Sequence, residues 1–137
     1  MNELRNIPIA EPDLGSRETE LVNRAMASKW ISSSGSYVME FEEKFARFTG
    51  ANYALSVCNG TQAIALALST LGIGPGDEVI IPTLTFGATA NAVVQVGANP
   101  VFVDVDPLTF GLSASIVEEA ISSRTRAILL VHLYGKP

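Results

Sequence analysis

The chain is poor in cysteine, histidine and charged residues. Its 137 residues include one cysteine and one histidine, and only 17% are charged, against about 25% in an average soluble domain. The lone cysteine, Cys58, cannot form an internal disulfide, which is typical of a protein from a reducing compartment. The net charge is −5 and no cluster of Lys or Arg occurs, so we expect no nucleic-acid partner.

Long apolar runs and targeting signals are missing as well. The longest apolar run covers residues 127–134, far below the ~20 residues of a membrane-spanning helix. Residues 1–15 carry acidic residues and prolines in place of the apolar stretch of a signal peptide. We therefore expect a cytoplasmic protein without a membrane association.

The first part of the chain, residues 1–50, is predicted to form an irregular arm and two helices. Ser16 is a suitable N-cap for the first helix, which should end near Lys29. Residues 37–48 repeat phenylalanine and valine at spacings of three and four, which is the pattern of an amphipathic helix. Gly50 is placed to end this helix at its C-cap.

The second part, residues 51–137, alternates short apolar runs with helical segments. The runs predict strands at residues 53–57, 78–82, 100–105 and 127–133. The predicted helices between them are residues 61–71, 86–95 and 113–121, the last with Ser113 as its N-cap. Nearly continuous apolar strands are expected to be covered on both faces, so the alternation predicts an α/β fold with a mostly parallel sheet flanked by helices.

Ligands of such sheets bind beyond the carboxyl ends of the strands, and the first of these ends is "CNGT", residues 58–61. It leads directly into a helix, whose first N–H groups have no partner within the helix and attract anions. A phosphate could bind there, with Gly60 permitting close approach of the backbone and Thr61 adding a hydroxyl. The alternative, that Thr61 is only the N-cap and Gly60 only a turn residue, stays open.

Other candidate residues give weaker signals. Phe86 follows the second predicted strand, where it could stack on a flat heteroaromatic ring or simply belong to the core. Asp104 and Asp106 could suggest a metal site, but two carboxylates are a weak pattern and we favour a solvated strand end, with no metal. A lone histidine, His132, is more often part of hydrogen-bonded structure than a catalyst.

The glycines of "LGIGPGDEV", residues 71–79, are a candidate for a dinucleotide-binding fingerprint. They follow a predicted helix and precede a predicted strand, which is the reverse of the order that phosphate binding needs. Gly72 is better interpreted as a helix C-cap and Pro75 with Gly76 as a turn.

Four motifs in order carry a resemblance to a known family. They are "KWISSSGSYVMEFEEKFARFTG", "CNGTQAIALAL", "LGIGPGDEVIIPTLTFGATANAV" and "PVFVDVDPLTFGL". Together they resemble the start of the DegT/StrS-type sugar aminotransferases, pyridoxal-phosphate (PLP) enzymes of the aspartate-aminotransferase fold (fold type I) whose members include perosamine synthase. The resemblance implies that residues 51–137 are the first part of the PLP-binding large domain, preceded by the arm and two helices of residues 1–50.

The resemblance also implies roles for individual residues. Gly60 and Thr61 match the pair that binds the cofactor phosphate, with Asn59 alongside, and Phe86 matches the aromatic residue that stacks on the pyridine ring. The family usually has serine where this chain has Cys58, a small departure that leaves phosphate binding plausible.

A substrate and partners follow from the same resemblance. The intact enzyme would move an amino group, usually from glutamate, to a keto sugar linked to a nucleotide, and would be a homodimer. The loop of residues 30–33 would lie near the active-site entrance, so Trp30, Ser32 and Ser33 are candidates for contact with the sugar nucleotide or the neighbouring subunit.

The catalytic residues of the family have no match in this chain. The lysine that forms the Schiff base with PLP and the acid that holds the pyridine nitrogen protonated lie beyond Pro137 in that family. None of Lys29, Lys44 and Lys136 fits that role, so we expect the chain alone to be inactive, with an exposed sheet edge that promotes self-association. The alternatives are a non-catalytic remnant, a PLP- or phosphate-binding module, and an NAD-binding Rossmann domain.

Overall fold

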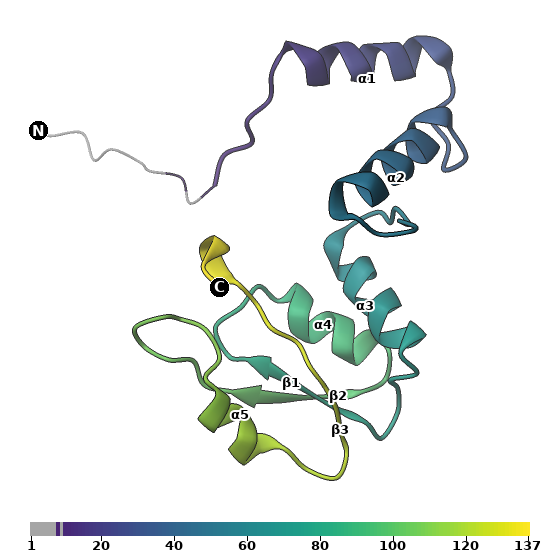
Figure 1. The fold of residues 1–137 in the computed structure, drawn as a ribbon. Helices are drawn as coiled ribbons and strands as arrows, with labels where there is room; N and C mark the ends of the chain where they lie inside the picture. Colours follow the sequence, from purple (N-terminus) through teal and green to yellow (C-terminus); the bar gives the residue numbers. More distant parts are fainter. Residues whose placement is uncertain (1–7, 9) are drawn as a thin grey trace, which may run out of the picture. The chain divides into compact units, whose positions relative to one another are not determined.

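The computed structural model describes residue 8 and residues 10–137, and the chain divides into two compact units, Met1–Ser56 and Val57–Pro137. The ribbon in Figure 1 shows helices alone in the described part of the first unit and a sheet with helices in the second. None of the helices in the described part of the chain is both long and apolar enough to cross a membrane.

The first unit begins with helix α1 (Ser16–Ser28). The prediction that Ser16 is the N-cap is wrong by one residue, because Gly15 is the last residue with extended backbone and Ser16 is already helical. Glu18, three residues after the cap, decides this position: its carboxylate Oε2 accepts a hydrogen bond from the Gly15 N–H at 2.7 Å, which is the half of a capping box that a glycine cap can make.

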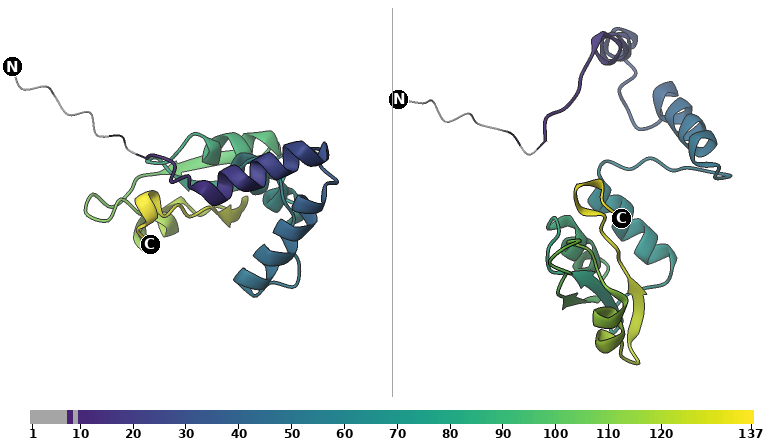
Figure 2. Two further views of the ribbon diagram at one scale, coloured as in Figure 1. Left: turned by 90° about the horizontal axis from the view of Figure 1, so that it is seen from above. Right: turned by 60° about the vertical axis from the view of Figure 1, so that its left-hand side comes forward.

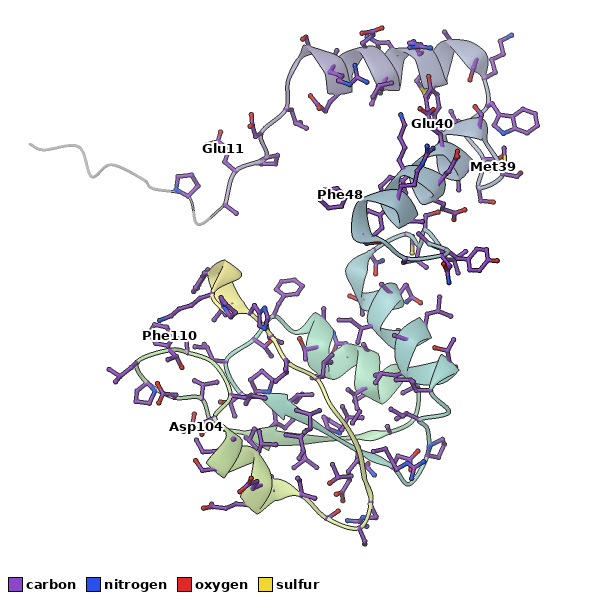
Figure 3. The ribbon with its side chains drawn as sticks, viewed as in Figure 1. Glu11, Met39, Glu40, Phe48, Asp104 and Phe110 are labelled. Atoms are coloured by element: carbon purple, nitrogen blue, oxygen red, sulfur yellow. The ribbon has the colours of Figure 1, made fainter. Side chains whose placement is uncertain are left out.

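Helix α2 (Ser36–Thr49) follows, and the predicted C-cap is confirmed. Gly50 adopts φ 72°, a left-handed conformation that costs glycine little. The rings of Phe41 and Phe45 lie one turn apart with centroids 5.6 Å from each other. Phe48, labelled in Figure 3, is 87% exposed, so the apolar stripe of α2 is only partly covered within its own unit.

The strand predicted at residues 53–57 is not found. Glu42 of α2 offers a physical reason, because its Oε1 accepts hydrogen bonds from both the N–H and the hydroxyl of Ser56, each at 2.8 Å. The Ser56 N–H is thus already used, and none of the strands in the described residues pairs with this segment. Tyr53 and Leu55 are exposed.

The second unit contains a parallel three-stranded sheet in the order β2-β1-β3. Its strands are β1 (Glu78–Pro82), β2 (Asn99–Val103) and β3 (Thr125–Ile128). Its helices are α3 (Gly60–Thr70), α4 (Ala88–Gln95), α5 (Ala114–Ala120) and the short 3-10 helix η1 (Leu133–Gly135). The predicted α/β fold with a parallel sheet is confirmed.

Alternate residues of β1 build two hydrophobic clusters on the two faces of the sheet. Val79 and Ile81 pack with residues of α3 and α4, whereas Ile80 packs with Val103 and with Val117 of α5. Figure 1 accordingly shows α4 and α5 on opposite sides of the strands. The three residues of β1 named here have no exposed surface, so the centre of the core lies in this strand.

Two expectations about the strands need correction. Only β1 is buried along its whole length, because β2 and β3 form the two edges of this sheet and carry exposed residues such as Phe102 and Ile128. The last strand, predicted over residues 127–133, ends at Ile128. Beyond it the chain continues without ladder pairing to η1, although the Leu129 N–H still donates to Ile80 O at 2.9 Å.

The glycine-rich segment between α3 and β1 is a turn, as predicted. The Asp77 N–H donates to Gly74 O at 3.1 Å, with Pro75 and Gly76 in the central positions. Gly76 has φ 92°, which the third residue of a type II turn requires and which residues with a side chain avoid. The structure thus agrees with rejecting a dinucleotide fingerprint at this place.

Candidate functional site

A hollow of about 570 Å³ lies where three segments of the second unit meet. These segments are the start of α3, the loop and first turn that follow β1, and residues 130–134 after β3. β1 and β3 are neighbours in the sheet, so their carboxyl ends deliver the last two segments to one place. In the right-hand view of Figure 2 the yellow C-terminal segment runs beside the beginning of α3.

The start of α3 supplies backbone donors to this hollow. Asn59, Gly60 and Thr61 all line it. The N-cap is Asn59, whose side-chain Oδ1 accepts a hydrogen bond from the Gln62 N–H at 3.0 Å. The alternative that Thr61 is the cap is therefore wrong, and within the described chain its hydroxyl makes no hydrogen bond. The leading N–H groups of an 11-residue helix carry partial positive charge, which suits a phosphate.

Gly60 leaves space at the edge of this cradle. A Cβ built on Gly60 meets no atom within 4 Å, so the protein itself does not require glycine at this position. A phosphate that approaches the backbone closely would use this space, and a methyl group would fill it. The start of α3 therefore has room for an anion close to the backbone.

Phe86 is not part of the core. It lies in the loop between β1 and α4, and its side chain is 79% exposed on the lining of the same hollow. The predicted helix at residues 86–95 begins later, at Ala88 with Gly87 as its N-cap, which leaves Phe86 outside the helix. The hydroxyls of Thr85 and Thr89 lie 2.8 Å apart and hold the loop against the first turn of α4. An exposed ring on a braced loop is suited to stacking on a pyridine.

The segment after β3 brings His132 and Tyr134 to the hollow. His132 is predicted to be a structural residue within a strand, whereas in the structure it follows the end of β3 and lines the hollow. Tyr134 has φ 56° and is 80% exposed, which sets it apart from a core tyrosine. The signal for both residues was their position after the carboxyl end of a parallel strand.

The electrostatics of the hollow depend on the backbone. Of the residues that line it, His132 and Tyr134 are the two with titratable side chains, and no Lys, Arg, Asp or Glu contributes to the lining. A bound phosphate would be held by N–H groups, hydroxyls and the α3 dipole, with no cationic side chain from this part of the chain.

Asp104 and Asp106 stabilise the loop after β2, which Figure 3 shows with Asp104 and Phe110 labelled. Asp104 Oδ1 accepts hydrogen bonds from the Thr83 hydroxyl and the Val105 N–H, at 3.3 Å and 2.8 Å. The N–H groups of Thr109 and Leu108, both donating to Asp106 Oδ1, hold the pKa of that carboxyl below its usual range. The described residues contain no group of three or more His, Cys, Asp or Glu side chains that could hold a metal ion.

The predicted substrate loop belongs to the first unit. Ser32 O accepts a hydrogen bond from the Gly35 N–H at 3.1 Å, which closes a turn that contains Ser33. A Cβ on Gly35 would lie 2.5 Å from Trp30 Cδ1, so the indole ring rests against the Gly35 backbone. Trp30 is 58% exposed, and its contact with a substrate stays a prediction.

Comparison with known proteins decides the family. A model of the DegT/DnrJ/EryC1/StrS aminotransferase family matches residues 12–137. The chain belongs to this family. It is similar to GDP-perosamine synthase of Escherichia coli O157:H7, with 49% identity over 134 residues, which is 98% of this chain and 37% of that protein. GDP-perosamine synthase of Caulobacter vibrioides is also 49% identical, over 99% of this chain and 37% of its own length.

Solved structures of the family agree with the fold. A protein from Streptococcus pneumoniae assigned as a sugar aminotransferase, solved in its PLP form, superposes with a TM-score of 0.86 at 35% identity. That comparison covers 96% of this chain and 33% of the solved one. The chain thus spans about a third of the length of its aminotransferase relatives.

None of Lys29, Lys44 and Lys136 is among the residues that line the hollow. Lys29 and Lys44 belong to the first unit, at the end of α1 and on α2, where Lys44 forms an ion pair with Glu40 one turn away. Lys136 Nζ donates to Leu108 O at 3.4 Å and does not line the hollow. The expectation that none of these lysines forms the Schiff base stays a prediction.

Proposed function

We propose that this chain supplies the phosphate and ring contacts of a PLP-dependent aminotransferase that moves an amino group from glutamate to a keto sugar linked to a nucleotide. One observation carries the proposal: the open start of α3 and the exposed ring of Phe86 line the same hollow at the carboxyl edge of a parallel sheet. A phosphate donor set and an aromatic platform are what a phosphorylated pyridine needs.

Each of these residues has a distinct task in the proposal. The N–H groups at Asn59, Gly60 and Thr61 bind the phosphate and fix the position of the cofactor, with the Thr61 hydroxyl as a further donor. Phe86 stacks on one face of the ring, orients it and excludes water from that face. When bound, PLP supplies an aldehyde that takes up the amino group and a ring that withdraws electrons.

The chemistry needs groups that are not among the residues lining the hollow. An amine nucleophile and an acid near the ring nitrogen are required, and neither Lys, Asp nor Glu lines the site. We therefore propose that the chain by itself binds the cofactor without transferring amino groups. The substrate role of Trp30, Ser32 and Ser33, and a homodimeric enzyme, belong to the same proposal.

Titration of the 137-residue chain with pyridoxine 5′-phosphate tests the proposal. This compound has the phosphate and the ring but no aldehyde, so its binding needs no lysine. We expect saturable binding and a raised melting temperature, with weaker binding of pyridoxine, which lacks the phosphate. Failure of pyridoxine 5′-phosphate to bind would contradict the proposal.

NAD serves as the comparison ligand for the remaining alternative. A Rossmann domain would be stabilised by NAD and not by pyridoxine 5′-phosphate. The turn at residues 74–77 places its glycines before β1 and away from any helix start, so we expect no thermal shift with NAD.

A further inference from the structure

The N-terminus of α3 carries an incomplete capping box. In a complete box, the N-cap side chain accepts from the N–H of the third helical residue, and the side chain of that residue accepts from the N–H of the cap. The first half is present in α3, where Asn59 Oδ1 accepts from the Gln62 N–H at 3.0 Å. Gln62 has a suitable side chain at the right position for the second half, but its Oε1 does not accept a hydrogen bond from the Asn59 N–H.

Helix α1 of the same chain shows the second half in place. There Glu18 Oε2 accepts from the Gly15 N–H at 2.7 Å. In α3 the Gln62 amide instead forms a reciprocal pair with the amide of Gln95: Gln62 Nε2 donates to Gln95 Oε1 at 3.2 Å, and Gln95 Nε2 donates to Gln62 Oε1 at 3.1 Å. Within the described chain the Asn59 N–H consequently has no acceptor.

We infer that Gln95 is a positioning residue for the phosphate site: by pairing with Gln62, it keeps the Asn59 N–H available to the cofactor. This inference rests on the proposed function. Asn59 lines the hollow together with Gly60 and Thr61, and in this inference its N–H, which has no acceptor in the described chain, is a further donor for the phosphate. A Gln62 side chain folded back onto Asn59 would occupy that donor and place an amide oxygen, with its negative partial charge, beside the phosphate.

The position of Gln95 suits this role. It is the last residue of α4, the helix that begins directly after Phe86 and Gly87. α4 packs against α3 in the cluster that contains Leu68 and Val93. The loop that leads into α4 thus carries the aromatic ring, and the last residue of the same helix contacts the first turn of α3.

A purely structural role for the amide pair makes a different prediction. If the pair only ties α3 to α4, loss of either glutamine should have the same effect, and loss of both should be no better than loss of one. If Gln95 acts by restraining Gln62, then Gln95→Ala should weaken phosphate binding, whereas Gln62→Ala should not. The double variant should behave like Gln62→Ala, because no side chain is left to close the box.

The test uses the 137-residue chain and these three variants, titrated with pyridoxine 5′-phosphate and, as the control without phosphate, with pyridoxine. From the size of a capping interaction, we expect Gln95→Ala to bind pyridoxine 5′-phosphate about fivefold more weakly. Binding of pyridoxine should be the same in all four proteins. Gln62→Ala and the double variant should bind both compounds as the unaltered chain does.

Amide hydrogen exchange gives a second readout that needs no ligand. The Asn59 N–H should exchange more slowly in Gln95→Ala than in the unaltered chain, and the double variant should return to the original rate. Equal weakening in Gln62→Ala and Gln95→Ala, or an unchanged Asn59 rate in Gln95→Ala, would overturn the inference. If the unaltered chain binds neither compound, the proposed function fails, and the Asn59 rate alone decides whether Gln95 restrains Gln62.

Discussion

Glu78 and Arg124 form an ion pair that joins the first residue of β1 to the residue before β3. The backbone reinforces it, since the Glu78 N–H donates to Arg124 O at 2.9 Å. The second carboxylate oxygen of Glu78 accepts from the Ser122 hydroxyl. The register between β1 and β3 shifts between Glu78 and Val79, so this contact anchors the pairing where the ladder is irregular. It lies at the opposite end of β1 from the loop that carries Phe86.

The first prediction concerns the pH dependence of stability. The hydrogen bond from Ser122 and the contact with Arg124 outweigh the burial of Glu78 and lower the pKa of its carboxyl. A lowered pKa in the folded state means that the contribution to stability is fully present above the unfolded-state pKa and is lost as the pH falls through the folded value. Glu78→Gln should therefore lower the urea midpoint at pH 7, with a difference that shrinks towards pH 3.

Glu119→Gln is the matched control for this measurement, because Glu119 is an exposed residue of α5 without a hydrogen-bonded side chain in the described structure. Its urea midpoint should follow that of the unaltered chain at both pH values. The urea midpoint of Glu78→Gln could instead lie equally far below that of the unaltered chain at pH 7 and at pH 3. This result would show that the effect does not come from the ionised carboxylate.

The second prediction separates the fold from the phosphate site at Gly60. Because a Cβ there meets no atom within 4 Å, Gly60→Ala should leave the free energy of unfolding unchanged or raise it by up to ~1 kcal/mol. The same methyl group should weaken the binding of pyridoxine 5′-phosphate and leave that of pyridoxine unchanged. Titration and urea unfolding of one preparation measure both effects.

Gly87→Ala controls for a general effect of alanine at a helix start. Gly87 is the N-cap of α4, and a Cβ there also meets no atom within 4 Å, but Gly87 does not line the hollow. The Gly87→Ala variant should bind pyridoxine 5′-phosphate as tightly as the unaltered chain does. Equal losses of binding in Gly60→Ala and Gly87→Ala would argue against a phosphate at the start of α3.

Local sequence predicted the helices well because their determinants are local. The spacing of apolar residues in α2, the left-handed Gly50 and the Ser113 cap of α5 are each fixed by residues within a few positions of one another. The N-terminus of α3 was harder, because Asn59 and Thr61 are both good capping residues. The structure decides between them: Asn59 Oδ1 accepts a hydrogen bond from the N–H of Gln62, the third helical residue, so Asn59 is the N-cap.

The strands were predicted less well because a strand depends on a partner that lies elsewhere in the chain. Residues 53–57 have the composition of a strand, but Glu42 takes the Ser56 N–H and none of the described strands pairs with the segment. His132 was missed as a lining residue for the same reason: its place outside the ladder follows from where β3 stops pairing with β1. The position of Phe86 after the second strand was predicted from the order of strands and helices, but its exposure required the structure, because the sequence left a core phenylalanine as the alternative.

The third prediction tests the centre of the core. Ile80 has no exposed surface and packs with Val103 and Val117, so Ile80→Val removes one buried methylene. We expect the free energy of unfolding to fall by ~1 kcal/mol. Ile121 follows α5 and is 54% exposed, so Ile121→Val should change it by less than ~0.5 kcal/mol. Equal losses in urea unfolding would contradict the placement of the core in β1.

The fourth prediction distinguishes ring stacking from phosphate binding. Phe86 is 79% exposed, so Phe86→Ala should cost the fold little. If its ring stacks on the pyridine, the loss should weaken pyridoxine and pyridoxine 5′-phosphate by the same factor, roughly three- to tenfold for an aromatic pair. Gly60→Ala should weaken the binding of the phosphorylated compound alone. The two variants therefore report separately on the phosphate contact and on the ring contact.

Phe48→Ala is the control, because it removes a ring that is 87% exposed on α2, and it should change the binding of neither compound. Weakening of only the phosphorylated compound in Phe86→Ala would mean that the side chain shapes the phosphate site and does not stack on the ring.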